Sequence, residues 1–231
     1  MSEIHVKDIE NTNEQNFVHE ISPGFRYKFN RTLTDTAAIF LEYSFLYDDH
    51  WNFKTGLSYN IAASSVNGYY FDFSYNNLAI KGLDLGLKFT NYSYALYKKG
   101  YNSIIPYAVI DIGFFFKLGI AFHFFNPYEE HIYNIFYYTP LGFETAFYYA
   151  IGWHFKNIKN IYSLKIEINN HDRFYSGTNA YIGLMIKNSL KITKTLELFL
   201  DLELRMSGSI ALAANFYVFG FDAGVTVRIG H

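Results

Sequence analysis

The sequence predicts an all-β protein, specifically a transmembrane antiparallel up-and-down β-barrel. Aromatic residues make up 21% of the 231 residues and charged residues only 17%, whereas a typical soluble domain has about 25% charged residues. Hydrophobic residues make up 50% of the chain, yet the mean hydropathy is −0.02, so apolar and polar residues are interleaved. This interleaving has a period of two, which is the period of a β-strand.

The most apolar stretch, residues 107–125, shows whether the chain crosses the membrane as strands or as helices. Its polar residues Asp111, Lys117 and His123 are all odd-numbered, so an extended chain places them on one face and the apolar residues on the other. A helix turns about 100° per residue and would point these three side chains in three different directions. The stretch is therefore predicted to be extended.

The same alternation recurs along the chain, with turn-forming residues between the runs. The runs cover residues 25–29, 39–47, 51–61, 69–75, 83–89, 107–125, 141–155, 162–168, 196–204 and 219–229. Within residues 209–229 the apolar positions change phase near Asn215, which predicts a turn or a bulge. Single-chain bacterial barrels have an even number of strands, so we predict twelve strands, with ten as the alternative. Residues 1–16 are predicted to be a polar N-terminal tail, and residues 17–231 the barrel.

The apolar face of these strands is predicted to point outward, towards the lipid bilayer. The polar face is mostly Gly, Ser, Asn and Thr with scattered charges, unlike the dense Lys and Glu of a water-exposed surface. The bulky apolar side chains are also too numerous to fit inside a small barrel. Aromatic residues at the rims of the apolar band would mark the membrane interfaces, and the candidates are Trp51, Tyr92, Tyr94, Tyr137, Tyr138 and Trp153.

Over residues 17–231 the chain resembles bacterial outer-membrane β-barrel proteins of the small porin-like class. The run 219–229, FGFDAGVTVRI, looks like the terminal strand that the barrel-assembly machinery reads, although the chain ends in Gly230-His231 instead of an aromatic residue. The resemblance implies an outer membrane in a Gram-negative-type envelope, with outer-membrane lipids and the assembly machinery as partners. Met1-Ser2-Glu3 does not begin a signal peptide, so we expect a mature sequence preceded by an added Met.

The strand phases predict a lumen lined by charged side chains. The candidates are Arg26, Lys28, Glu42, Lys54, Asp72, Asp84, Lys88, Asp111, Lys117, Glu144, Lys165, Glu167, Glu197, Asp201, Glu203, Arg205, Asp222 and Arg228. Together with Lys187 and Lys191, the set balances cations against carboxylates. Paired across the barrel these charges would form a plug, whereas in contact with water they would line a weakly selective pore.

The function predicted from this lumen is a small pore or passive diffusion channel for ions or small solutes. The alternative is a closed structural or adhesive barrel that acts through its loops, of which 91–103 and 169–179 are the longest candidates. An outer-membrane hydrolase is less favoured because no serine stands in a nucleophile motif, and His171-Asp172-Arg173 reads as a solvated loop. His123 and His154 are the other histidines considered, and no catalytic residue is predicted.

Several partner classes are not predicted. The net charge of −2 and the lack of a basic block exclude a nucleic-acid groove, and the absence of cysteine excludes disulfides and thiolate metal sites. The loop clusters 48–50 and 129–131 contain acidic residues and a histidine, but they lack a complete ligand spacing. No metal and no cofactor are predicted, and the sequence does not indicate an oligomeric state.

Overall fold

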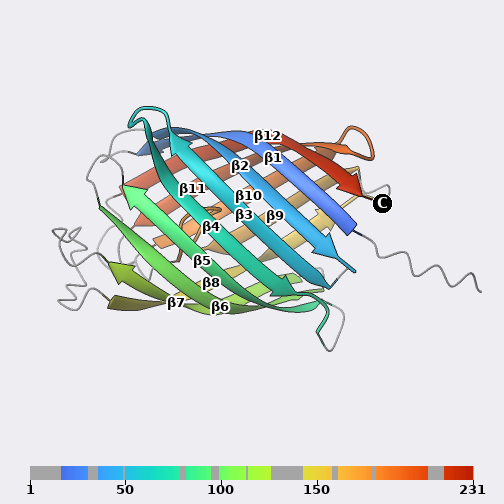
Figure 1. The fold of residues 1–231 in the computed structure, drawn as a ribbon, viewed down its shortest axis with the longest axis horizontal. Helices are drawn as coiled ribbons and strands as arrows, with labels where there is room; N and C mark the ends of the chain where they lie inside the picture. The colour runs from blue at the N-terminus through green and yellow to red at the C-terminus, as the bar shows by residue number, and fades with distance from the viewer. Residues whose placement is uncertain are drawn as a thin grey trace, which may run out of the picture.

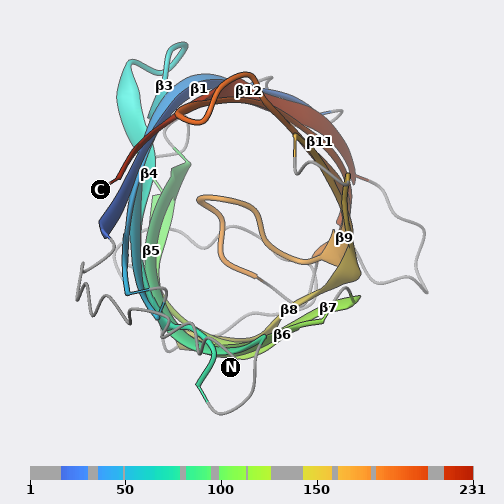
Figure 2. The same cartoon turned by 90° about the vertical axis from the view of Figure 1, so that its right-hand side faces the viewer.

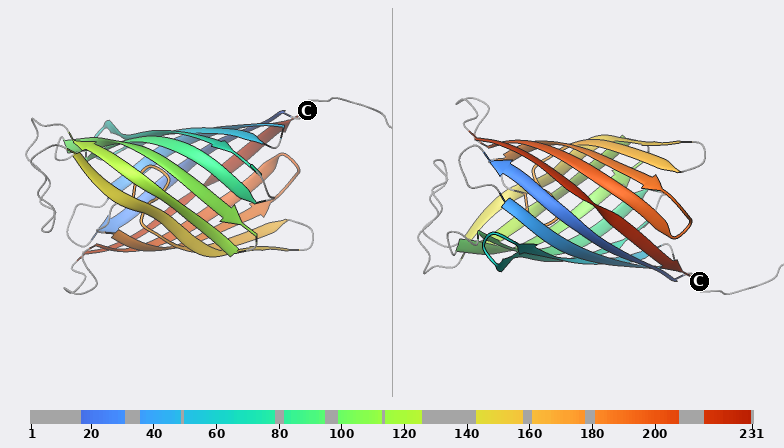
Figure 3. Two further views of the ribbon diagram at one scale, coloured as in Figure 1. Left: turned by 90° about the horizontal axis from the view of Figure 1, so that it is seen from below. Right: turned by 90° about the horizontal axis from the view of Figure 1, so that it is seen from above.

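The computed structural model is a closed barrel of twelve antiparallel strands, as predicted (Figure 1). The structure describes residues 17–30, 36–48, 50–78, 82–94, 99–112, 114–125, 143–157, 161–177, 181–207 and 216–230. Each strand pairs with the next along the chain, and β1 pairs with β12 to close the wall. The strands are tilted relative to the barrel axis on both sides of the wall (Figure 3). Tilted, closed pairing leaves no strand edge open to the membrane.

The strands are β1 (Phe17–Asn30), β2 (Thr36–Tyr47), β3 (Trp51–Asn60), β4 (Ser65–Tyr75), β5 (Leu83–Tyr94), β6 (Lys99–Asp111), β7 (Phe114–Phe125), β8 (Phe143–Lys156), β9 (Tyr162–Asn169), β10 (Tyr181–Lys191), β11 (Leu196–Ser207) and β12 (Phe216–Gly230). Every strand except β10 overlaps one of the alternating runs, and β1, β5 and β6 extend well beyond theirs. The phase change near Asn215 falls within 208–215, outside the described residues.

Residues 107–125 form the end of β6 and the whole of β7 instead of one run. Asp111 pairs with Phe115 across the turn between these strands. Because paired residues here are both odd-numbered, Asp111, Lys117 and His123 keep the same face although the chain reverses between them. Because the alternation stays in phase through this tight turn, the sequence pattern does not reveal the turn.

The outer wall of the barrel is apolar. Leu41, Leu87 and Leu200, which come from three different strands, are 51%, 52% and 44% exposed. Soluble proteins rarely expose apolar patches larger than a few hundred Å², and here the apolar side chains recur on strand after strand. This wall therefore faces lipid. No helix in the described part of the chain is long and apolar enough to cross a membrane.

Two of the six predicted interface aromatics lie on the outer wall. Trp51 and Trp153 are exposed, and their rings pack against Phe73 and Phe114 with centroids 5.3 and 5.8 Å apart. The prediction for Tyr92 was wrong, because the outward residues of β5 are odd-numbered and Tyr92 points inward with Lys88. Tyr137, Tyr138 and the side chain of Tyr94 fall outside what the structure describes.

The two ends of the barrel differ in their connections. At the end that holds the start of β1 and the end of β12, the connections are 48–50, 76–82, 112–113, 157–161 and 192–195. The other end holds the connections 31–35, 61–64, 95–98, 126–142, 170–180 and 208–215. The two longest connections, 126–142 and 170–180, are both at this end, and the longer loops of outer-membrane barrels are at the extracellular end.

Candidate functional site

The connection after β9 enters the barrel instead of extending away from it. Figure 2 shows this segment inside the ring of strands. We call residues 170–177 the lumen loop. Phe174 and Ser176 are fully buried, and Asp172 is 5% exposed. The prediction that His171-Asp172-Arg173 forms a solvated loop was therefore wrong, because charges on the barrel wall bind Asp172 and Arg173 and because His171 is buried.

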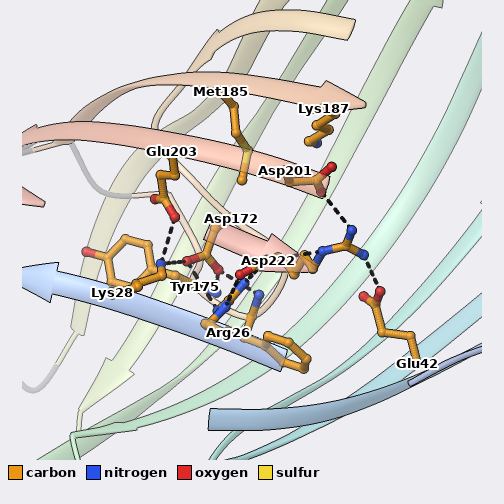
Figure 4. Close-up of polar contacts among 12 residues, drawn as sticks. Arg26, Lys28, Glu42, Asp172, Tyr175, Met185, Lys187, Asp201, Glu203 and Asp222 are labelled. Carbon is orange, nitrogen blue, oxygen red and sulfur yellow. Dashed lines mark hydrogen bonds and ion pairs between the residues drawn. The ribbon is translucent and has the colours of Figure 1, made fainter. Parts of the chain in front are cut away.

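Asp172 binds basic side chains of the barrel wall. Its Oδ2 atom lies 2.5 Å from Lys28 Nζ and 3.5 Å from Arg26 Nη1 (Figure 4). The same atom lies 4.0 Å from Arg205 Nη2. Its Oδ1 atom accepts hydrogen bonds from the backbone N–H groups of residues 174 and 175, at 2.7 and 2.6 Å. This is an Asx-type turn. Asp172 thus shapes the lumen loop and ties it to β1 and β11.

Arg173 binds carboxylates of the barrel wall in the same way. It pairs with Glu42 from β2, with Asp201 from β11 at 2.7 Å, and with Asp222 from β12 at 3.2 Å. Asp201 and Asp222 are direct cross-strand neighbours, and like charges in this position destabilise a sheet. The guanidinium of Arg173 relieves this repulsion, which gives a physical reason for the loop to enter the lumen.

The wall residues also bind one another. Arg26 donates two hydrogen bonds to Asp222, at 2.8 and 2.7 Å, and Lys28 Nζ lies 2.9 Å from Glu203 Oε2. We call the whole set the loop network: Arg26, Lys28, Glu42, Asp172, Arg173, Asp201, Glu203, Arg205 and Asp222. It joins four cations to five carboxylates. Low dielectric makes such a network strong when it is complete and costly when one member is missing.

Aromatic packing holds the next part of the lumen loop. Phe174 lies between Phe40 and Tyr70, with ring centroids 5.9 and 5.5 Å from its own. Tyr175 meets Tyr92 edge-on at 5.4 Å. Burying a phenylalanine contributes about 1.5–3 kcal/mol, so this packing adds to the ion pairs and fixes the loop against β2, β4 and β5.

The far end of the lumen loop is held by Ser103 and His123. Ser103 Oγ lies 2.7 Å from His123 Nδ1 and 2.8 Å from Ser176 Oγ. His123 Nε2 lies 2.7 Å from the carbonyl oxygen of Gly177. A carbonyl only accepts, so Nε2 donates and Nδ1 accepts from the Ser103 hydroxyl. Ser103, His123 and Ser176 are all fully buried, so the pair positions the loop and does not present an accessible nucleophile.

The other side of the lumen carries lysines. Lys165 and Lys187 are cross-strand neighbours on β9 and β10, and both bind Glu167, at 3.5 and 2.8 Å. Lys117 Nζ lies over the rings of Tyr107 and Tyr148, at 3.9 and 4.8 Å from the centroids. Lys88 Nζ lies 4.6 Å from the Tyr70 centroid, and Asp72 accepts a hydrogen bond from the Tyr107 hydroxyl at 2.6 Å.

The remaining lumen candidates lie outside these two groups. Arg228 binds Glu20 and lies 4.0 Å from Glu197, and Asp111 lies 4.0 Å from His154. Asp84 accepts a hydrogen bond from the backbone N–H of Asn77 at 2.9 Å. In the strand register Lys54 faces Asp72, and Glu144 faces His123. Glu20 was not among the predicted lumen residues, because the predicted first strand begins at residue 25. Within the described ranges, no three His, Asp or Glu side chains form a group that could hold a metal ion.

Comparison with known proteins agrees with this architecture. No protein-family model matches the sequence, and no curated protein matches it significantly. Among solved structures, the KdgM porin superposes with a TM-score of 0.54 and 13% identity, over 89% of this chain and 98% of that chain. The KdgM porin in complex with disordered oligogalacturonate gives a TM-score of 0.54 and 14% identity, with the same coverage. Outer membrane phospholipase A from Escherichia coli gives 0.45 and 11%, over 89% of each chain.

The likeness to the KdgM porin covers nearly the whole of both chains and shows a common fold. The closed antiparallel wall and its apolar outer face are the features that this fold needs in order to cross a membrane. The chain is therefore a twelve-stranded transmembrane β-barrel that shares the fold of the KdgM porin.

Proposed function

We propose that the barrel is a passive channel for ions and small solutes, narrowed by the lumen loop. One observation carries this proposal: among the described residues, no carboxylate lies within 4 Å of the ammonium groups of Lys88 and Lys117. A sealed plug has to pair its charges, because an unpaired ion away from water costs several kcal/mol. Water is therefore expected to reach this side of the lumen.

The two sides of the lumen would then have different roles. On one side the loop network pairs its charges tightly and holds the lumen loop in place. On the other side the lysines would line the aqueous path and, with the remaining predicted lumen residues, tune the conductance. The fold supports a channel, since the KdgM porin is named as one, and one KdgM structure contains an oligogalacturonate.

The second candidate is a closed barrel that serves as a scaffold or adhesin. The loop network favours it, since paired charges are what a plug requires. We rank it below the channel because the lysine side lacks matching carboxylates. We propose no enzymatic activity, because the Ser103–His123 pair is fully buried and is occupied by the lumen loop.

Single-channel recording tests the proposal. We expect the refolded protein in a planar bilayer, with unequal salt on the two sides, to give discrete current steps and weak ion selectivity. A barrel that is inserted and resistant to protease, yet carries no current, would contradict the channel and favour the closed barrel.

A further inference from the structure

The lysine side of the lumen holds more cations than its carboxylates can pair. We call Lys88, Lys117, Lys165 and Lys187, which come from β5, β7, β9 and β10, the lysine cluster. The carboxylates among them are Glu167 and Asp72. Glu167 already binds two of the lysines and accepts a hydrogen bond from Asn169 at 2.7 Å. Asp72 faces Lys88 across the β4–β5 pair and accepts a hydrogen bond from the Tyr107 hydroxyl. Two carboxylates therefore stand against four lysines.

The lysines also repel one another. The carboxylates of Asp72 and Glu167 favour the charge on Lys117, whereas the ammonium groups of Lys88 and Lys187 oppose it. Lys165 also faces Lys187 directly across the β9–β10 pair. Like charges in that register are destabilising. The arrangement therefore costs the fold stability unless water or an anion compensates for it.

Aromatic rings compensate for only part of this charge. Lys117 lies over two tyrosine rings and Lys88 over a third, while Lys165 Nζ lies 3.2 Å from the Phe115 centroid. Cation–π contacts contribute about 0.5–2 kcal/mol each, which is less than a desolvated ammonium loses. Lys88 also donates a hydrogen bond to the backbone carbonyl of Arg173 at 3.0 Å, which orients it without neutralising it.

His171 gives an independent indication of a missing partner. Its ring stacks on that of Tyr148 with a centroid separation of 4.0 Å, and the residue is only 8% exposed. Its Nδ1 atom is buried and has no hydrogen-bond partner among the described residues. Three lysines of the cluster act electrostatically on this ring. A buried polar atom without a partner costs about 1–3 kcal/mol, so a group that Nδ1–H could bind would relieve that cost.

We propose that the lysine cluster and His171 form a binding site for the oxyanion group of a solute, either a carboxylate or a phosphate. An oxyanion would accept hydrogen bonds from the ammonium groups and from Nδ1–H of His171, and its charge would offset the lysine excess. The tyrosine faces would bound the site laterally. The site deepens the proposed channel function, because a solute has to enter the lumen to reach it.

Thermal unfolding of the full-length barrel in detergent micelles tests the site without measuring current. Sodium phosphate, sodium acetate and sodium chloride are compared at equal ionic strength and at pH 7. We expect phosphate to raise the unfolding midpoint above that in chloride by about 2–4 °C when it is several-fold above its Kd. A similar rise in acetate would assign the site to carboxylates as well, and no rise in acetate would restrict it to phosphate.

Lys117→Gln provides the decisive comparison, and Lys194→Gln is its control. Lys194 is exposed in the turn 192–195, so the control removes the same charge outside the lumen. We expect Lys117→Gln to lose most of the phosphate shift and Lys194→Gln to keep it. Any general stabilisation by phosphate as a salt would raise the unfolding midpoint of Lys117→Gln and of Lys194→Gln equally. Lys88→Gln is the second variant and should behave as Lys117→Gln does.

An equal phosphate shift in the wild type and both lumen variants would overturn the site. So would the absence of any shift in the wild type. These results are distinguishable from a failure of the channel proposal. A barrel that carries no current but is stabilised by phosphate through Lys117 would support the site and reject the channel. A conducting barrel without a Lys117-dependent shift would support the channel and reject the site.

Discussion

Arg173→Ala is expected to destabilise the barrel by about 3 kcal/mol and to shift its ion selectivity towards cations. The substitution removes the one guanidinium that contacts Glu42, Asp201 and Asp222. Breaking a buried ion pair by removing one partner costs about 3–5 kcal/mol, and we take the lower end because the Arg173 side chain is 22% exposed. Urea unfolding in detergent measures the first effect, and the reversal potential in a salt gradient measures the second.

Arg228→Ala is the matched control for this experiment. It removes the same charge from the inward face, but the Arg228 and Glu20 side chains are 36% and 29% exposed. Pairs this exposed contribute about 0–1 kcal/mol, so we expect a small loss of stability and a smaller change in reversal potential. Equal effects of the two substitutions would mean that Arg173 does not organise the lumen loop.

Leu200→Arg is expected to destabilise the membrane-inserted barrel by about 2–4 kcal/mol, or to block its insertion. Leu200 is on the outward face near the middle of β11 and is 44% exposed. An arginine that faces lipid at the bilayer midplane costs this amount, and the cost falls to about 0–1 kcal/mol near the interface. Folding into lipid vesicles, followed by heat-dependent gel mobility, measures the effect.

Met206→Arg is the control on the same strand and the same face. Met206 is outward-facing and one residue from the end of β11, where the side chain can reach the headgroups. We expect it to insert nearly as well as the wild type. If Leu200→Arg inserted as readily as Met206→Arg, Leu200 would not face the lipid.

The fold could be predicted from the sequence because the membrane imposes a period of two on each spanning segment. Strand β11 shows this clearly, with leucines outward and charges inward. β10 was missed because Met185 occupies an inward position between Leu184 and Ile186, which blurs the alternation. The turn between β6 and β7 was missed because it preserves the parity of the inward residues.

The lumen loop could not be predicted because its partners are distant in the sequence. Arg173 and Glu42 are 131 residues apart, and the sequence shows only a polar segment between two strands. Its composition offered a signal all the same, since an acid, an arginine, a phenylalanine and a tyrosine follow one another at 172–175. Two adjacent aromatic residues are unusual in a solvated loop tip. The acid and the arginine beside them are complementary to a barrel wall that carries both positive and negative side chains.

We expect the lumen loop to lie inside the barrel while the channel conducts. A disulfide between Ser103→Cys and Ser176→Cys would hold the loop there, because the two Oγ atoms are 2.8 Å apart and the chain contains no other cysteine. We expect the bond to form in the folded protein, and the cross-linked barrel to show the same current steps as the reduced protein and the single-cysteine controls. A barrel that conducts only after reduction, or cysteines that do not cross-link, would contradict a conducting barrel with the lumen loop inside it.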